Sequence, residues 1–180
     1  CIYSYLVTFG IVKSIIYLFV YIFRNIKKRM ERTIKCACDK IIAIFIGDPK
    51  LRTICHCRDC RKANGGDDFQ DLMFCNINQI KIVVPRDQLI EVPASEYKDE
   101  CPRYFCKDCN TFIYGDVSQK DGRPMALIGP MSVLTPTLPN MKPSLHMYIQ
   151  DKVIPALPND GLPRVESLSK SPYGKELMSK

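Results

Sequence analysis

The positions of the cysteines constrain this chain more than any other feature of its sequence. Seven of the ten cysteines fall in three tight clusters, Cys36-x-Cys38, Cys55-x-Cys57-x-x-Cys60 and Cys106-x-x-Cys109. Such spacing is typical of zinc ligands. Four thiolates close a structural tetrahedral site, whereas three leave one coordination position for water or a substrate. Seven cysteines divide into four plus three, which predicts two Zn²⁺ ions per chain, one structural and one able to take part in chemistry.

Disulfide bonds are the alternative explanation for this many cysteines. A disulfide framework suits small secreted domains, and the sequence shows no cleavable secretion signal. The two cysteines of a Cys-x-Cys pair cannot easily bridge each other, although both can reach one metal ion. We therefore favour zinc, which implies a reducing compartment. Three cysteines, Cys1, Cys75 and Cys101, lie outside the clusters and receive no role.

Residues 1–23 form an almost unbroken apolar run, interrupted by Lys13. A helix of this length would reach about 34 Å, enough to cross a bilayer core of about 30 Å. The positive-inside rule would place the basic linker that follows, residues 24–32, in the cytoplasm. We interpret 1–23 as an N-terminal apolar helix and candidate membrane anchor, with the zinc domain facing the cytoplasm. Because the chain begins with Cys1 rather than methionine, a fragment or gene-model extension is an alternative, and so is a buried part of the domain.

The net charge of +7 is concentrated in one place. Six basic residues and one acid lie between Arg24 and Lys35, so this segment carries +5. Metal binding lowers the charge of the remainder further, because cysteines bind as thiolates. A general nucleic-acid-binding face is therefore not expected.

Short apolar stretches separated by turns predict a mainly β domain over residues 33–165. Strands are expected at 40–46, 52–57, 78–84, 88–92, 104–105, 111–117, 123–128 and 144–150. The turn Gly47-Asp48-Pro49 would return 52–57 beside 40–46, and Pro85-Arg86-Asp87 would join 78–84 and 88–92 in a hairpin. The fold class is thus antiparallel sheets around the two zinc sites. Residues 166–180 are expected to be a flexible tail.

The outer two clusters, Cys36/Cys38 and Cys106/Cys109, each offer two ligands from a tight turn. Pairing them makes a closed Cys₄ site that ties an early strand to a late one. Such a site contributes about 10–16 kcal/mol of folding free energy, comparable to the net stability of a small domain. A redox role for Cys106-x-x-Cys109 alone is the alternative, although no βαβ context surrounds it.

The middle cluster places three ligands, Cys55, Cys57 and Cys60, within six residues. An open zinc there can lower the pKa of a bound thiol, polarise a carbonyl and orient two reactants. In an extended segment His56 points away from the face shared by its neighbours, so we read it as an orienting residue rather than a ligand. His146 is expected to be an ordinary buried histidine. Asp59 could relay protons or simply orient the loop.

Three cations in the same loop, Arg58, Arg61 and Lys62, would attract the carboxylates of a small anionic substrate. A solvated basic loop without a ligand is the alternative for each of them.

The combined motif resembles the glutathione-dependent formaldehyde-activating enzyme family, which also contains the centromere protein V-like proteins. The resemblance is carried by the three cysteine clusters, Ala63-Asn64-Gly65, Arg103-Tyr104-Phe105, Gly129-Pro130 and Pro143-Ser144-Leu145-His146, and it runs from about Ile34 to about Arg164. It implies a mostly β fold, with Cys36, Cys38, Cys106 and Cys109 as structural zinc ligands. Cys55, Cys57 and Cys60 would be the catalytic zinc ligands.

The family's namesake activity is condensation of glutathione with formaldehyde to S-(hydroxymethyl)glutathione, formally a carbon–sulfur lyase running in reverse. The resemblance thus implies a lyase whose partners are glutathione or a related thiol and an aldehyde. Two alternatives are a non-catalytic zinc-stabilised binding module with a protein or chromatin partner, and a carrier of glutathione or metal. The sequence departs from the family at Asn110, where a glycine is usual; asparagine tolerates the left-handed turn required there. The tryptophan often found after His146 is also missing.

Overall fold

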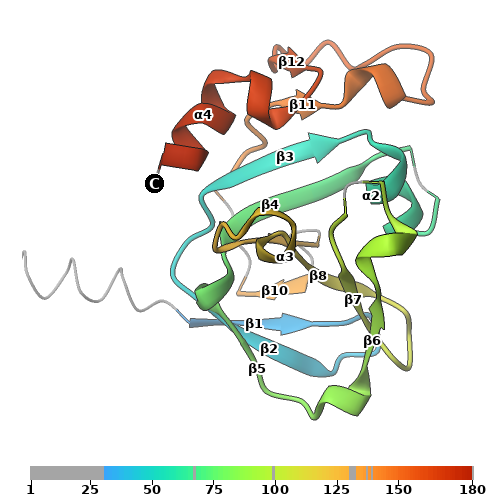
Figure 1. The fold of residues 1–180 in the computed structure, drawn as a ribbon, viewed down its shortest axis with the longest axis vertical. Helices are drawn as coiled ribbons and strands as arrows, with labels where there is room; N and C mark the ends of the chain where they lie inside the picture. Colours follow the sequence, from blue (N-terminus) through green and yellow to red (C-terminus); the bar gives the residue numbers. More distant parts are fainter. Residues whose placement is uncertain are drawn as a thin grey trace, which may run out of the picture.

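The computed structural model describes residues 31–66, 68–98, 100–129, 133–136, 138 and 140–179, which form two β-sheets with short helices at their edges (Figure 1). The four-stranded sheet has the order β10 (Leu134–Thr135), β1 (Glu31–Lys35), β2 (Ile41–Ile46), β5 (Ile80–Ile82). The eight-stranded sheet has the order β12 (Arg164–Val165), β11 (His146–Met147), β3 (Leu51–Cys55), β4 (Gln70–Asn76), β9 (Met125–Ile128), β8 (Phe112–Asp116), β7 (Arg103–Cys106), β6 (Leu89–Val92).

The helices are short and lie outside the sheets. The α-helices of the described residues are α2 (Arg58–Ala63), α3 (Ser118–Asp121) and α4 (Pro172–Ser179). Single 3₁₀ turns occur at Ile77–Gln79, Arg86–Gln88, Ala94–Glu96, Ile149–Asp151 and Leu168–Lys170. The prediction of a mainly β fold is therefore confirmed.

The larger sheet is mixed rather than purely antiparallel. Strand β11 runs parallel to both of its neighbours, β3 and β12, whereas the other paired strands of this sheet are antiparallel. A parallel neighbour cannot be joined by a tight hairpin, and long stretches of chain separate β11 from both β3 and β12. The expectation of antiparallel sheets was wrong for this edge, because a local pattern does not reveal the direction of a distant strand.

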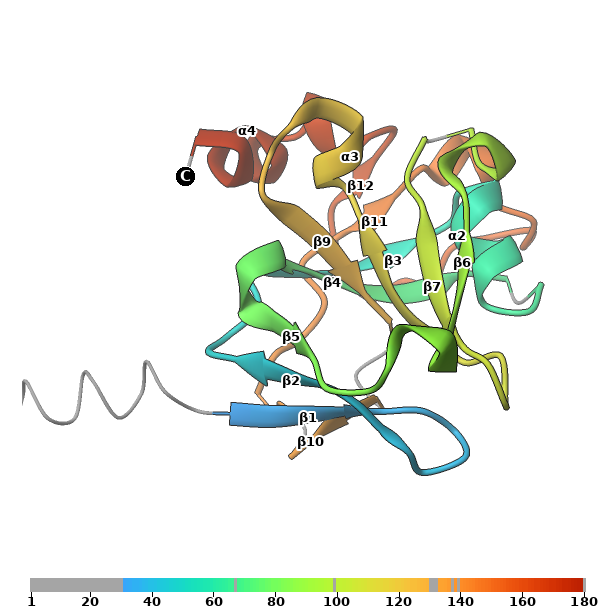
Figure 2. The same ribbon diagram turned by 60° about the horizontal axis from the view of Figure 1, so that its bottom comes forward.

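Alternation along the central strands gives the eight-stranded sheet two different faces. Met73 and Cys75 of β4 belong to the core that contains Ile34 and Phe45 of the smaller sheet. The alternate β4 residues Leu72 and Phe74 belong to a second core, which also contains Cys55 and Cys60. Figure 2 shows the smaller sheet as a separate layer below β4 and β9. One face of the large sheet thus packs against the small sheet, and the other supports the middle cysteine cluster.

Several strands lie where the sequence predicted them, but two expected pairings are absent. Strands β7 and β8 form the predicted antiparallel pair around Cys106-x-x-Cys109. Strand β3 pairs with β4 and β11 instead of returning beside β2, because the turn with left-handed Gly47 (φ 85°) passes the chain from one sheet to the other. Likewise β5 and β6 lie in different sheets and form no hairpin.

The two ends of the domain extend beyond the predicted bounds. Residues 1–23, the candidate anchor, and 24–30 of the basic linker lie outside the described residues. Glu31 and Arg32, which we had placed in that linker, begin β1, where the buried Arg32 guanidinium donates to the Gly47 carbonyl at 2.6 Å. The segment predicted to be a flexible tail contains α4, and Leu168 packs against the core. Among the described residues, no helix has both the length and the apolar character needed to cross a membrane.

Candidate metal centres and the adjoining cavity

The outer cysteine clusters come together where the two sheets meet. Cys36 and Cys38 lie in the turn after β1, whereas Cys106 is the last residue of β7 and Cys109 lies in the turn between β7 and β8. The backbone N–H of Ala37 donates to the Thr111 hydroxyl at 3.0 Å, which joins the two turns directly. Lys40 and Asp108 add an ion pair between them. The group therefore ties the small sheet to the large one.

The spacing of the sulfurs in this group fits a tetrahedral zinc ion. All four Sγ atoms lie within 4.8 Å of one another. The Sγ of Cys38 is 3.1 Å from that of Cys36 and 3.8 Å from that of Cys106. A tetrahedron with Zn–S bonds of about 2.3 Å places its sulfurs about 3.8 Å apart. Small adjustments of the side chains would complete the geometry, so Cys36, Cys38, Cys106 and Cys109 could hold a structural zinc.

The turn after Cys106 requires a backbone conformation that few residues adopt. Asn110 has φ 55°, and its N–H donates to the Cys106 carbonyl at 2.9 Å. Asparagine is one of the residues that visit this left-handed region routinely. The prediction that Asn110 preserves the turn in place of glycine is confirmed.

The middle cluster sits at the junction of β3 and α2. Cys55 is the last residue of β3, and Cys57 is the N-cap of α2, where its Sγ accepts from the Cys60 N–H at 3.3 Å. Strand β11 fixes the same segment from the other side, since the N–H of His56 donates to the Met147 carbonyl at 3.0 Å. The three Sγ atoms of Cys55, Cys57 and Cys60 lie within 4.8 Å of one another, and no other described His, Cys, Asp or Glu joins the group.

Among these three thiols, Cys57 ionises most readily. Hydrogen bonds from the Cys55 and Cys60 thiols lower the pKa of Cys57 to about 3, and the positive charge of Arg103 acts in the same direction. Burial raises the pKa of Cys55 well above its ordinary value. A metal dication would supply the charge that allows all three sulfurs to bind as thiolates. The donor set therefore suits zinc with one position left open.

A buried cation lies beside the cluster. Arg103 is fully buried at the start of β7, where its guanidinium stacks on the Tyr97 ring at 3.9 Å from the centroid and donates to the Cys101 carbonyl at 2.9 Å. Three or four thiolates around one zinc carry a net negative charge, which is costly to bury alone. Arg103 supplies a positive charge on the same side of the sheet.

His56 is held away from the cluster, as predicted. Its ring is fully buried, and its Nε2 lies 2.9 Å from His146 Nδ1. The other ring nitrogen of His146, Nε2, lies 2.9 Å from a carboxylate oxygen of Asp160. Burial lowers the pKa of His56, and the nearby His146 adds to this effect. The chain of contacts fixes the orientation of the segment between Cys55 and Cys57.

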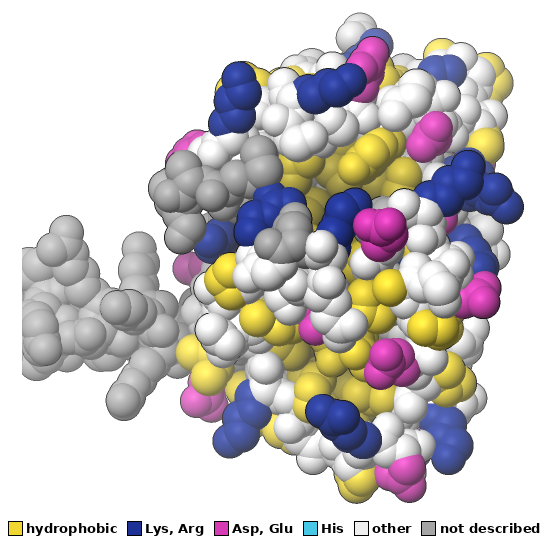
Figure 3. All heavy atoms as spheres, in the orientation of Figure 1, with side chains coloured by type: hydrophobic (Ala, Val, Ile, Leu, Met, Phe, Trp, Pro, Cys, Tyr) yellow, Lys and Arg dark blue, Asp and Glu magenta, His cyan; other side chains and the backbone are white. Residues whose placement is uncertain are grey.

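A cavity of about 610 Å³ opens beside Cys57 and Cys60. Its apolar lining includes Phe74, Leu127 and Leu168. Figure 3 shows hydrophobic side chains in a hollow on this face, with Lys and Arg side chains around it. The volume lies within the range of about 300–1,000 Å³ that is typical of small-molecule sites.

The three cations predicted to bind substrate have different surroundings. Arg58 and Arg61 line the cavity, but the Arg61 guanidinium already donates to the backbone carbonyls of His56 and Asp151, at 3.2 and 3.3 Å. Lys62 lies over the Tyr97 ring and 3.8 Å from Glu96, beside a second cavity of about 430 Å³. The nearly buried Asp59 also lines the first cavity.

Sequence reasoning missed several residues of this cavity. Lys98, Lys120 and Arg123 line it from segments far from Cys55, Cys57 and Cys60 in sequence, as does Cys101. Cys101 had received no role, and Cys75 lies in the other core. Nothing in the local sequence around Lys120 or Arg123 marks them, because only the packing of β8 and β9 beside β4 brings them to this face.

Comparisons with known proteins add one firm result. The family model described as "Glutathione-dependent formaldehyde-activating enzyme" matches residues 31–151, a range that contains both cysteine groups. No curated protein gives a significant match. A crystal structure of a Rhodobacter sphaeroides protein is similar with a TM-score of 0.41 and 10% identity, over 74% of this chain and 98% of that one. At that level of likeness it indicates neither fold nor function.

Proposed function

Because this chain belongs to the glutathione-dependent formaldehyde-activating enzyme family, we propose that it is a zinc-dependent carbon–sulfur lyase working in the direction of synthesis. It joins glutathione, or a related thiol, to formaldehyde or a similar aldehyde. The thiolate sulfur adds to the carbonyl carbon and forms the C–S bond. The π electron pair of the C=O bond moves to oxygen, which takes a proton from water and becomes the hydroxyl of the S-(hydroxymethyl) product.

The observation that carries this proposal is the position of the three-cysteine group at the edge of a cavity. Cys55 and Cys60 are buried, whereas Cys57 is partly exposed, and both Cys57 and Cys60 line the cavity. A zinc ion held by the three sulfurs would keep its open position for the substrate thiol and hold it as a thiolate at neutral pH. The Cys₄ group, with four ligands from the chain, would leave no such position.

The protein's own residues contribute binding and orientation. The N-cap position of Cys57 and the β11 contact at His56 fix two of the ligand positions relative to the cavity. The apolar side chains Phe74, Met125 and Leu127 form a surface against which the carbon skeleton of a thiol can pack. Holding both reactants in one cavity replaces an encounter in water with a reaction between oriented neighbours.

The test is the rate of S-(hydroxymethyl)glutathione formation from formaldehyde and glutathione, with the zinc-loaded full chain. We expect acceleration over the uncatalysed rate, and a loss of at least about a hundredfold in Cys60→Ser, because removing a ligand should cost no less than the roughly 10–100-fold of removing a partner of a ligand. Cys75→Ala is the matched control, because Cys75 is a buried thiol of the opposite core.

The outcome separates an enzyme from a binding module. Acceleration that survives in Cys60→Ser would remove the three-cysteine group from the mechanism. No acceleration by the parent chain, with two zinc ions bound and the fold intact, would contradict the proposed reaction and favour a zinc-stabilised module that binds a partner without turnover.

A further inference from the structure

The side chain of Gln70, at the start of β4, is buried without a hydrogen-bond partner. It is 1% exposed, and neither its amide nitrogen Nε2 nor its amide oxygen Oε1 is paired with any group of the described residues. Buried polar groups are normally paired, because an unpaired one loses its hydrogen bonds to water without replacement. A fully buried amide with both polar atoms unpaired therefore calls for an explanation from its surroundings.

The pairing of β3 with β4 places Gln70 directly opposite Cys55, one of the three clustered cysteines. Leu51 and Phe74 are paired at the other end of the two strands, and the register continues from there without a shift. Both belong to the core that contains Cys55. Directly opposite residues of antiparallel strands share a face, with Cβ atoms about 4.5–5.5 Å apart. The long Gln70 side chain therefore lies within reach of the Cys55 sulfur.

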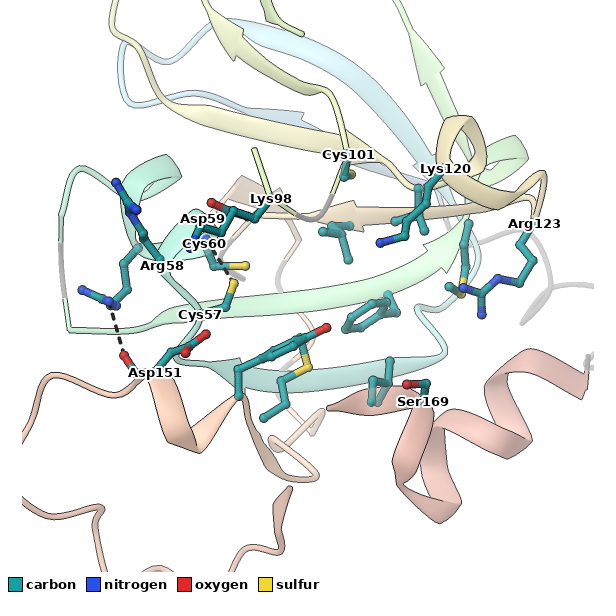
Figure 4. Close-up of a pocket in the computed structure, with 18 residues that line it drawn as sticks. Cys57, Arg58, Asp59, Cys60, Lys98, Cys101, Lys120, Arg123, Asp151 and Ser169 are labelled. Carbon is teal, nitrogen blue, oxygen red and sulfur yellow. Dashed lines mark hydrogen bonds between the residues drawn. The ribbon is translucent and has the colours of Figure 1, made fainter. Parts of the chain in front are cut away.

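Gln70 lies behind the cysteine group rather than in the cavity beside it. Figure 4 shows the sulfurs of Cys57 and Cys60 at the cavity, which both residues line. Neither Cys55 nor Gln70 belongs to its described lining. A role of Gln70 in the chemistry of this site would therefore act through Cys55 and the metal, without contact with a reactant.

A zinc ion at the three cysteines would give the Gln70 amide an acceptor. As a thiol, Cys55 donates to the Cys57 sulfur at 3.5 Å. As a zinc ligand, Cys55 is a thiolate and accepts hydrogen bonds. The amide carries two N–H donors, and a half-turn about its last bond exchanges its nitrogen and oxygen. Hydrogen bonds donated to metal ligands from outside the coordination sphere orient the ligands and strengthen metal binding.

We propose that Gln70 is a positioning residue of the three-cysteine zinc site, where its amide N–H donates to the zinc-bound thiolate of Cys55. The bond holds the Cys55 sulfur from outside the cavity and offsets part of the negative charge of the three thiolates. This inference rests on the proposed function, because it takes the three-cysteine group to hold zinc. It adds to that site a residue that lies outside both the cysteine motif and the cavity lining.

The test is chelator competition with the zinc-loaded full chain, which gives the zinc affinities of the two cysteine groups separately. Gln70→Leu removes the N–H donors and should weaken zinc binding by the three-cysteine group about tenfold, the lower end of the usual loss when a partner of a metal ligand is removed. The Cys₄ group should keep its affinity, because Cys36 and Cys106 belong to the opposite core. Gln70→Met, which also lacks the donors, takes the place of the leucine variant if that one does not fold.

Thr53→Val is the matched control. Thr53 is also fully buried with an unpaired hydroxyl, two residues before Cys55 on β3, but it lies opposite Leu72 rather than opposite a cysteine. Its replacement should leave both zinc affinities unchanged.

A spectroscopic measurement separates a hydrogen bond to sulfur from an effect on packing. An N–H donor lowers the energy of the sulfur lone pairs, so it raises the energy of the sulfur-to-metal charge-transfer band. With Co²⁺ at the three-cysteine group, this band should move to longer wavelength in Gln70→Leu and stay in place in Thr53→Val.

Unchanged zinc affinity of the three-cysteine group in the Gln70 variants, or a charge-transfer band that does not move, would overturn the inference. An equal loss of affinity in Thr53→Val would overturn it too. A failure of the proposed function gives a different result. If Gln70→Leu loses zinc affinity as expected but the parent chain does not accelerate adduct formation, only the reaction is contradicted. If the parent chain accelerates adduct formation and Gln70→Leu keeps its zinc affinity, only the role of Gln70 is contradicted.

Discussion

His56 Nε2 and His146 Nδ1 lie 2.9 Å apart, although the two residues are separated by 90 positions in the chain. Both rings are almost completely buried and stack with an interplanar angle of 20°. The pair joins the loop of the middle cysteine cluster to β11, and the Asp160 carboxylate continues it at the surface. A histidine between two metal-binding cysteines is thus fixed by a contact that no local pattern indicates.

Replacing His146 by leucine should destabilise the fold, because it leaves a buried nitrogen of His56 without its partner. We expect a decrease of about 1–3 kcal/mol in the free energy of unfolding, the usual cost of an unsatisfied buried polar group. Urea unfolding of the zinc-loaded chain measures it. Asp160→Asn should change stability much less, since this carboxylate is exposed to solvent. Equal losses of unfolding free energy in the two variants would show that the buried contact between His56 and His146 contributes no more to stability than the exposed carboxylate of Asp160.

Removing one ligand of the Cys₄ group should do more damage than removing one ligand of the middle cluster. Cys109→Ser is expected to lose one zinc equivalent and to unfold the domain, because a structural zinc contributes about 10–16 kcal/mol. Cys60→Ser is expected to lower metal content while keeping the fold. Metal analysis and circular dichroism of both variants check this. A folded Cys109→Ser protein with one zinc would contradict the structural assignment.

Arg103 should strengthen metal binding by the middle cluster, because its buried charge offsets the negative charge of the thiolates. Arg103→Met should weaken zinc binding there about tenfold, corresponding to about 1.4 kcal/mol of lost electrostatic attraction. Competition with a zinc chelator gives the two affinities separately. Arg103→Lys, which keeps the charge, should retain most of the affinity. An unchanged chelator curve for Arg103→Met would show that the charge of Arg103 does not act on the metal.

Cys75 should make the fold sensitive to alkaline pH. Burial raises the pKa of this thiol from 9.0 to about 12, so the folded state keeps it protonated where the unfolded state ionises it. Its contribution to stability is complete below about pH 9 and is lost progressively as the pH rises to about 12, at about 1.4 kcal/mol per pH unit. The unfolding free energy of Cys75→Ala should therefore fall less steeply over this range. If the unfolding free energies of the two proteins fell in parallel with pH, the raised pKa of Cys75 in the folded state would be contradicted.

The sequence predicted the local parts of this protein well. Tight spacing identifies Cys36 with Cys38, and Cys106 with Cys109, as candidate metal ligands. Asn110 is a residue type that accepts the left-handed turn found there. Short apolar stretches bounded by turns located β2, β7 and β8. Such features depend on neighbours in the chain, so they can be read without the fold. The family resemblance, confirmed by the match over residues 31–151, implied the same grouping of the clusters into four and three that the count and spacing of the cysteines had suggested.

The sequence also led to errors where a turn could continue in more than one direction. Gly47-Asp48-Pro49 marks a turn correctly, but it does not specify that β3 leaves the sheet of β2. The cations nearest to Cys60 were predicted to bind substrate because of their position in the sequence. The Arg61 guanidinium, however, donates to backbone carbonyls. Position near Cys60 in the sequence found two of the cations that line the cavity, Arg58 and Arg61, but not Lys98, Lys120 and Arg123, which come from distant segments.

By itself, the sequence determined the residue types and the short spacings that make two metal sites possible, together with a mainly β fold and a family. Only the tertiary structure decided that one cysteine group lies between the sheets and the other beside a cavity, that His56 meets His146, and that Lys120 and Arg123 line the cavity toward its other end. The reason is physical: thiol spacing is a property of a few covalently linked residues, whereas burial and charge distribution in a cavity depend on strands brought together from across the chain.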